Sequence, residues 1–337
     1  MSTTVVAFFN NKGGVGKTTL VYHLAWMLSD LGQRVLAVDL DPQANLTSAF
    51  LEEERLVELW PDGAHSETIQ GCIEPLQNGT GDITDPHVEE VDPCDQSPYL
   101  LAGDLAISRF EDDLSQEWPH CLDRKERAFR VISAFWRMIQ RAATKQSFDV
   151  ALVDLGPNLG SINRAALIAA DYVVVPLSPD LYSLQGLRNM GPTLKQWRAE
   201  WSDRLARNPQ PGLLLPAGQI RAAGYIVMQH AERLDRPVQA YHRWIDRVPD
   251  LYRSMMLDQS GTHADSVKTD PNCLTLLKHY RSLVPLAQDA HKPVFHLKPA
   301  DGALGSHFYS AQEAGRQFKE LALTLAERTG LRVPADT

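Results

Sequence analysis

Long apolar runs and cysteines are scarce in this chain, and each scarcity excludes a class of protein. No apolar run approaches the ~18 residues that a membrane-spanning helix needs, and no basic, signal-type segment precedes the first apolar stretch. We therefore expect a cytoplasmic protein with no membrane partner. The four cysteines are Cys72, Cys94, Cys121 and Cys273. They are far apart and lack C-x-x-C spacing, which excludes a zinc site and a disulfide framework.

Positive charge is also in short supply. The chain has 33 Lys and Arg against 42 Asp and Glu, so its formal net charge is −9. This balance excludes a surface coated in positive charge for nucleic acid. Any DNA binding would have to use a local basic patch and would weaken steeply with salt. With 337 residues and 44% hydrophobic content the chain can bury a sizeable core, and we expect a single domain over residues 1–337.

The most informative stretch lies near the N-terminus. Residues 5–9 form a short apolar run, residues 10–16 are rich in glycine, and apolar residues recur at helical spacing over 20–28. Strand, glycine-rich loop and helix in this order are the context of a phosphate-binding loop. Glycine lets the backbone wrap closely around an anion, and the helix N-terminus offers it partial positive charge. The predicted nucleotide-binding residues of this loop are Gly13, Gly14, Val15, Gly16, Lys17, Thr18 and Thr19.

Two side chains of this loop carry the expected chemistry. Lys17 would reach the β- and γ-phosphates, and the Thr18 hydroxyl would bind Mg²⁺. ATP and Mg²⁺ are therefore the predicted cofactors. The alternative is an ordinary glycine-rich turn before a helix, which would leave the Gly-Lys-Thr sequence without an explanation.

The loop departs from the usual G-x-x-x-x-G-K-[ST] pattern in one place. Asn11 occupies the position of the first glycine, and Lys12 follows it. The K-G-G-x-G-K-T-T form resembles the deviant Walker A motif of the ParA/MinD family of ATPases, and most closely its ParA/Soj-like partitioning members. In that family the first lysine crosses a dimer interface to the partner's nucleotide. The resemblance implies a catalytic role in trans for Lys12 in an ATP-bound homodimer; the alternative is a solvated loop lysine.

A second buried strand is predicted over residues 34–38, and it runs into Asp39-Leu40-Asp41-Pro42-Gln43. Ligands of parallel sheets sit beyond the carboxyl ends of the strands, so two aspartates suit this position. The stretch closely matches the second nucleotide motif of the ParA family. By that resemblance Asp41 would position or activate the attacking water, and Asp39 would support the Mg²⁺ shell. A turn at Pro42 with aspartate capping is the alternative.

A third signal is the apolar run at residues 148–153 that ends in Asp154. A buried strand ending in an acid is typical of the Walker B motif, which holds the carboxylate near Mg²⁺. By the same resemblance, Met228 and Gln229 at the end of a later strand would contact the adenine base. Residues 248–253 are similar to the family's I-P-x-x-x-R segment, which implies a weak, non-specific DNA contact from Arg253.

Two stretches resemble the family least. Residues 51–98 are acidic with scattered Pro and Gly, and we expect a loop-rich insertion with helical pieces near 55–60 and 66–77. Its acids would form either a solvated face or a partner-binding surface. Residues 254–282 are expected to be a second insertion. Apolar periodicity predicts one long helix over 124–145 and a terminal helix over 310–328.

The alternation of strands and helices predicts a doubly wound α/β fold, with a mainly parallel sheet and helices on both faces. Right-handed crossovers would bring the three motif loops to one edge. The resemblance implies a slow ATPase switch that dimerises on ATP, positions DNA or other cargo, is stimulated by an adaptor protein, and would be nucleoid-associated if it binds DNA. The alternative is an ATP-gated subunit of a secretion, polysaccharide-synthesis or defence assembly without DNA binding. A metabolic kinase or reductase-type relative is a third hypothesis, although the cysteine spacing gives no sign of a cluster.

Overall fold

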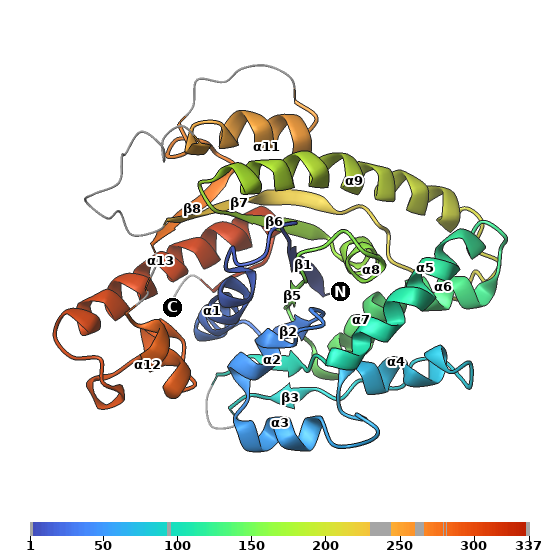
Figure 1. The fold of residues 1–337 in the computed structure, drawn as a ribbon, viewed down its shortest axis with the longest axis horizontal. Coiled ribbons are helices and arrows are strands. Elements are labelled where there is room, and N and C mark those ends of the chain that lie inside the picture. Colours follow the sequence, from blue (N-terminus) through green and yellow to red (C-terminus); the bar gives the residue numbers. More distant parts are fainter. Residues whose placement is uncertain are drawn as a thin grey trace.

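A single sheet forms the centre of the molecule in the computed structural model, which describes residues 3–92, 96–229, 244–259, 266–278, 280 and 282–334. The strand order is β3-β4-β2-β5-β1-β6-β7-β8 (Figure 1). β3 is antiparallel to β4, and the other neighbouring strands are parallel. The strands are β1 (Thr4–Phe8), β2 (Val35–Asp39), β3 (Glu89–Glu90), β4 (Tyr99–Leu101), β5 (Val150–Asp154), β6 (Tyr172–Leu177), β7 (Arg221–Gln229) and β8 (Cys273–Lys278).

Helices cover both faces of this sheet, which confirms the doubly wound prediction. One face carries α1 (Lys17–Asp30), α2 (Asn45–Phe50), α3 (Glu53–Leu59), α12 (Val284–Asp289) and α13 (Ser306–Thr329), and α13 lies against α1 (Figure 1). The opposite face carries α4 (Ile69–Gln77), α5 (Phe110–His120), α6 (Glu126–Ile132), α7 (Ala134–Gln146), α8 (Ser161–Ala169), α9 (Leu181–Leu205) and α11 (Val248–Met256). The described residues also include the short 3₁₀ helices η1 (Leu105–Arg109), η2 (Val294–His296) and η3 (Pro299–Asp301).

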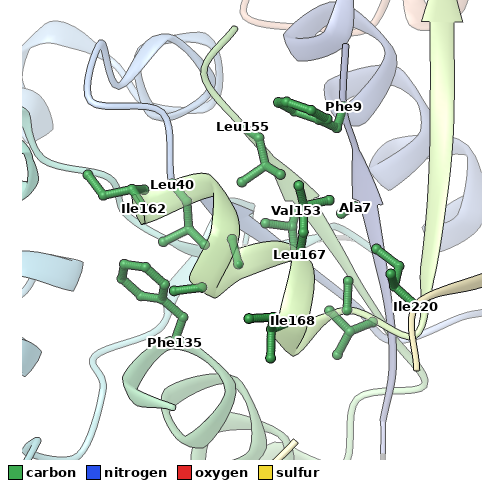
Figure 2. Close-up of a cluster of buried hydrophobic side chains, with 14 of the residues drawn as sticks. Ala7, Phe9, Leu40, Phe135, Val153, Leu155, Ile162, Leu167, Ile168 and Ile220 are labelled. Atoms are coloured by element: carbon green, nitrogen blue, oxygen red, sulfur yellow. The ribbon is translucent and has the colours of Figure 1, made fainter. Parts of the chain in front are cut away.

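The central strand β1 explains why the first apolar run is continuous rather than alternating. Val5 and Ala7 belong to the hydrophobic cluster under α7 and α8, whereas Val6 and Phe8 belong to the cluster under α1 and α13. Helices cover both faces of a parallel sheet, so side chains on both sides of each strand are buried. Figure 2 shows part of the first cluster, in which Ala7 and Val153 of adjacent strands face Leu167 of α8.

The three motif loops meet because their strands are neighbours. β2, β5 and β1 are adjacent and parallel, and Asp39, Asp154 and Phe8 share one level of the register. The chain therefore leaves all three strands at the same edge of the sheet, which we call the nucleotide edge. The predicted convergence of the motif loops is confirmed.

Several predicted boundaries were wrong. The single helix over 124–145 is two helices, α6 and α7, that meet at Ser133. The Ser133 hydroxyl donates to the Phe129 carbonyl at 2.6 Å, a side-chain bond that competes with regular helix bonding. Arg124 has a left-handed φ of 60° and lies outside the helix. The terminal helix, predicted over 310–328, begins earlier, at Ser306.

The segment expected as a second insertion also contains part of the sheet. β8 lies inside residues 254–282 and pairs in parallel with β7. Its side chains are only partly buried because it is an edge strand, so it lacks the continuous apolar run of the central strands. Residues 260–265, 279 and 281 of the same segment lie outside the described residues.

The inserted segment, residues 51–98, packs against the rest of the fold through ion pairs. Its helical pieces, α3 and α4, are close to the predicted positions. Asp82 accepts from Arg137 of α7 at 2.7 Å and pairs with Arg130 of α6 at 2.5 Å. Within the segment itself, Arg55 pairs with Glu67 at 2.5 Å and also with Glu89. The expectation of a solvated acidic face is wrong for Asp82 and Glu89, whose side chains are 27% and 11% exposed and pair with arginines; the Glu67 side chain is 45% exposed and fits it. Among the described residues, no helix is both long and apolar enough to cross a bilayer.

Candidate active site

The glycine-rich loop between β1 and α1 has the backbone that anion binding needs. Gly14 and Gly16 have φ values of 69° and 87°, in the left-handed region where a side chain is disfavoured. A Cβ atom added to Gly14 would meet no atom within 4 Å, so the backbone there faces open space. The loop leads directly into α1, which begins at Lys17. Its backbone N–H groups and the helix N-terminus can therefore be offered to a phosphate.

Lys17 and Thr18 lie at the base of this loop, against the carboxylate that ends β5. The Thr18 hydroxyl donates to Asp154 at 2.6 Å. Lys17 is only 7% exposed, and Asp154 is fully buried. Burial lowers the pKa of Lys17, although Asp154 and Asp41 oppose that shift. Burial and the charge of Asp39 raise the pKa of Asp154, although the bond from Thr18 opposes the rise.

These shifts identify the ligand chemistry that the site would favour. A phosphate would stabilise the charged form of Lys17, and a divalent cation would stabilise the charged form of Asp154. A hydroxyl and a carboxylate are oxygen donors of the type that Mg²⁺ prefers. The donor set of Thr18 and Asp154 thus fits the predicted metal, and the glycine-rich loop fits the phosphates.

The two aspartates after β2 have different surroundings. Both oxygens of the fully buried Asp39 accept hydrogen bonds, from the Asp41 and Thr47 backbone N–H groups and from the Thr47 hydroxyl. Burial raises the pKa of Asp39 to about 6. These bonds make Asp39 an anchor for the loop that follows, and a direct metal contact would require some of them to be given up. Asp41 is 7% exposed and lies near Gly156, where an added Cβ would be 3.3 Å from its Oδ1.

Lys12 lies apart from this group. Its ammonium pairs with Asp180, and the two side chains are 27% and 35% exposed. Asp180 also caps α9, because its other oxygen accepts from the Ser183 N–H at 2.9 Å. The two lysines of the loop therefore have separate partners in one protomer: Lys17 faces the buried carboxylates, whereas Lys12 faces the start of α9.

Sequence analysis missed three residues that support the loops. Asp180 was not singled out because 168 positions separate it from Lys12. Glu111 of α5 accepts from the Ser161 N–H and, at 2.8 Å, from the Ile162 N–H, and so caps α8. Asn163 donates to the carbonyls of Gly156 and Asn158 at 2.8 and 2.6 Å, which holds the loop after Asp154. The contacts of Asp180 with Lys12 and of Glu111 with α8 join residues that are distant in the chain, so no sequence pattern signals them.

The residues predicted to contact adenine and DNA lie in different surroundings. The Met228 side chain lies against the phosphate-binding loop, where a Cβ on Gly16 would be 3.0 Å from its Cε; the Gln229 side chain lies outside the described residues. Arg253 is only 4% exposed, and its guanidinium donates to the buried Asp270 at 2.8 Å. The weak DNA contact predicted for Arg253 is not supported by this placement, because the ion pair holds the guanidinium inside the fold.

Two cavities lie near or beyond the loop. One of about 520 Å³ is lined by Thr18 and Thr19 together with parts of α1, α2 and α12. A larger one of about 1040 Å³ lies between the C-terminal half of α1, the inserted segment and η2, and none of the predicted nucleotide residues lines it. The chemistry of the motif loops, rather than cavity size, therefore locates the candidate site at the nucleotide edge.

Comparison with known proteins identifies a family and several relatives that this chain resembles. A family model described as an AAA domain matches residues 3–206. The chain is 29% identical over 195 residues to sporulation initiation inhibitor protein Soj of Bacillus subtilis, which covers 57% of this chain and 64% of that protein. It is 32% identical over 201 residues to the chromosome-partitioning ATPase Soj of Thermus thermophilus, which covers 59% of this chain and 65% of that one. The chain thus spans slightly less than two thirds of these relatives.

Solved structures share the fold over nearly the whole chain. Protein DIP2308 from Corynebacterium diphtheriae has a TM-score of 0.72 at 23% identity, covering 96% of this chain and 98% of that one. An ATP complex of McdA from Cyanothece has a TM-score of 0.59 at 15% identity, covering 99% of both chains. At these identities the likeness shows the fold alone.

Proposed function

Because the chain belongs to the ParA/MinD-type ATPases, whose AAA-domain model matches residues 3–206, we propose that it is an ATP-dependent dimerising switch. It binds and slowly hydrolyses ATP, and the ATP state positions DNA or another cargo. The observation that carries the proposal is the contact of Thr18 with Asp154 at 2.6 Å, beside the buried Lys17 and below an open glycine-rich loop. Low intrinsic turnover suits a switch, and an adaptor protein would raise the rate.

The chain's own residues divide the work of phosphoryl transfer, in which positioning and charge stabilisation dominate. Lys17 and the loop N–H groups bind the phosphates. Thr18 and Asp154 hold Mg²⁺, which supplies positive charge to the phosphate oxygens when bound. Asp41 orients or activates the attacking water. Asp39 holds the loop that carries Asp41 and so supports the same site from behind.

Lys12 is proposed to act in a partner protomer. Its ion pair with Asp180 keeps it away from Lys17 within one protomer, and both side chains are exposed enough for a second copy to reach. Moving Lys12 to the partner's phosphates would break that pair, and the new contact with a triphosphate would replace it. The proposal therefore includes exchange of one ion pair for another on dimerisation.

Sizing in the presence of ATP and Mg²⁺ tests this role. Lys12→Ala should leave ATP binding intact and abolish the ATP-dependent dimer. Lys195→Ala is the matched control, because Lys195 is an exposed lysine of α9 paired with Asp258, and it should dimerise normally. A Lys12→Ala variant that still dimerises on ATP would show that the trans role is wrong.

A second candidate function is an ATP-gated interaction subunit of a larger assembly that does not bind DNA. The net charge of −9 and the burial of Arg253 favour it. Retention of the wild-type protein on non-specific duplex DNA with ATP at low salt, lost as salt rises, would support the positioning function. Absence of retention at any salt would support the assembly function. Arg253→Ala is unsuitable as the diagnostic variant, because it would leave the buried Asp270 without its arginine. Phosphate release without an added acceptor would argue against a kinase.

A further inference from the structure

Thr47 joins two loops of the nucleotide edge through a fully buried hydroxyl. Its Oγ1 donates to Asp39 Oδ2 at 2.8 Å and accepts from the Gly103 N–H at 2.8 Å. Its backbone N–H donates to the same Asp39 oxygen at 2.8 Å. Thr47 has no exposed surface, so water cannot replace these partners. One side chain thus connects the end of β2, the start of α2 and the turn after β4.

These bonds close the Asp41 loop, residues 40–47, at both of its ends. Asp39 Oδ1 accepts from the Asp41 N–H at 3.3 Å, and Asp39 Oδ2 accepts from Thr47. Between these points Ala44 has a left-handed φ of 52°, a conformation that a residue with a side chain adopts only when its surroundings impose it. The carboxylate of Asp41 therefore depends for its position on a loop that the Thr47 contacts hold shut.

The Gly103 backbone lies very close to Asp39, so the turn after β4 packs tightly against the end of β2. A Cβ atom at Gly103 would lie 2.8 Å from Asp39 Cγ, so only glycine lets the backbone come near enough to donate to Thr47. Removing the Thr47 hydroxyl would leave the buried Gly103 N–H without its acceptor and Asp39 Oδ2 with one donor fewer. Both lost hydrogen bonds belong to groups that hold the Asp41 loop.

We propose that Thr47 is a positioning residue for ATP hydrolysis, which sets the place of Asp41 through Asp39 and Gly103. The inference rests on the proposed function, because it concerns the loop that carries the proposed water-orienting group. The side-chain hydrogen bonds of Thr47 go to Asp39 and Gly103 and not to residues 13–19, which would hold the phosphates. Its removal should therefore affect the chemical step far more than nucleotide binding.

The test compares three variants of the full chain. Thr47→Val keeps the shape and deletes the hydroxyl; it should lower kcat by about tenfold or more, since small displacements of a positioned group cost large factors in rate. The KM for ATP and the Kd for a non-hydrolysable ATP analogue should stay within about threefold of wild type. Thr47→Ser restores the hydroxyl and should recover most of kcat.

Thr68→Val is the matched control. Thr68 is also buried and donates through its hydroxyl to a buried carboxylate, Asp104, at 2.7 Å. Asp104 adjoins Gly103, but Thr68 makes no bond to the Asp41 loop. This variant should lose stability as Thr47→Val does and yet keep kcat. Equal kcat losses in the two variants, an unchanged kcat in Thr47→Val, or no recovery in Thr47→Ser would overturn the proposal.

Amide hydrogen exchange separates this inference from the proposed function. With the ATP analogue bound, exchange over residues 41–47 should quicken in Thr47→Val and not in Thr68→Val, while residues 13–19 stay protected in both. If the wild-type protein hydrolyses no ATP, the proposed function fails and exchange alone decides; unchanged exchange over 41–47 would then overturn the role of Thr47. Should Thr47→Val fail to fold, Thr47→Cys, which keeps only a weak S–H donor, takes its place.

Discussion

The nucleotide edge and the inserted segment both bury charged side chains, but they treat the charges in opposite ways. At the nucleotide edge, burial lowers the pKa of Lys17 and raises the pKa of Asp154, so that both shifts favour the neutral forms. In the inserted segment, burial also acts on Asp82, but hydrogen bonds and charge from Arg137 outweigh it and lower the pKa of Asp82. The nucleotide edge thus leaves its charged groups incompletely stabilised, whereas Asp82 of the inserted segment is stabilised by arginine partners.

The difference teaches how to separate a ligand site from a packing contact. Charges that a fold buries and leaves incompletely stabilised are costly, and such groups cluster where a ligand will supply the missing partner. Charges that the fold neutralises internally attach one segment to another. The comparison makes opposite predictions for the two sets of charges: substituting the incompletely stabilised Lys17 should affect binding and spare stability, and substituting an arginine that attaches the inserted segment should do the reverse.

The largest expected effect is on nucleotide binding. Lys17→Ala should weaken the affinity for Mg·ATP by ~1,000-fold, or about 4 kcal/mol, because it removes the cation facing the phosphates. The free energy of unfolding without nucleotide should change little, because the desolvation cost of the removed amine offsets its lost attraction to Asp154 and Asp41. Fluorescent-analogue titration and urea denaturation measure the two quantities. A large loss of stability with intact binding would break the comparison at this edge.

The next effect is on stability alone. Arg137 is 7% exposed and donates to Asp82, to the Arg130 carbonyl and to the Ser133 hydroxyl. Arg137→Met should lower the free energy of unfolding by about 3 kcal/mol, because it removes the donor to the buried Ser133 hydroxyl and to the Arg130 carbonyl, and one of the arginines that pair with Asp82. ATP affinity should not change. Lys145→Met is the control, since its pair with Asp85 is more than half exposed and should contribute less than about 1 kcal/mol.

The smallest expected effect concerns pH. His23 of α1 is buried; one ring nitrogen contacts the Thr19 carbonyl at 2.7 Å and the other accepts from the Val294 N–H at 3.2 Å. Burial lowers the pKa of His23 to about 4, below the value of ~6.5 in an unfolded chain. The unfolded state therefore binds more protons between these values, and stability falls as pH falls.

Comparison with His23→Gln isolates this term from the other titrating groups. Between pH 7 and pH 5 the wild type should lose about 2 kcal/mol more unfolding free energy than the variant. Urea denaturation at both pH values measures the difference. Equal losses in the two proteins would mean that the pKa of His23 is the same in the folded and unfolded states. Burial of His23 in α1 would then make no contribution to the pH dependence of stability.

The elements of the site that could be predicted are those encoded by neighbours in the chain. The phosphate-binding loop, Lys17 and Thr18 follow from a local glycine pattern, and Asp154 follows from an apolar run that ends in an acid. The sheet edge that gathers them follows from the alternation of strands and helices. Such signals need no knowledge of which strand lies beside which.

What could not be predicted depends on contacts between distant residues. Thr47 meets Gly103 only because β2 pairs with β4, and Lys12 meets Asp180 across 168 positions. The break at Ser133 is hidden because the apolar period continues through it, and β8 is hidden because an edge strand needs no continuous apolar run. Asp82 of the inserted segment looked solvated in the sequence, since its arginine partners lie on α6 and α7.

The two-residue strand β3 has a consequence for how copies of the chain can associate. Unpaired strand edges invite another chain to add its own strand. Here the outermost strand next to β4 consists of Glu89 and Glu90 alone, antiparallel to its neighbour. A second copy extending the sheet there would gain few backbone bonds and would bring acids together. The inserted segment thereby discourages open-ended extension of the sheet from copy to copy through this edge.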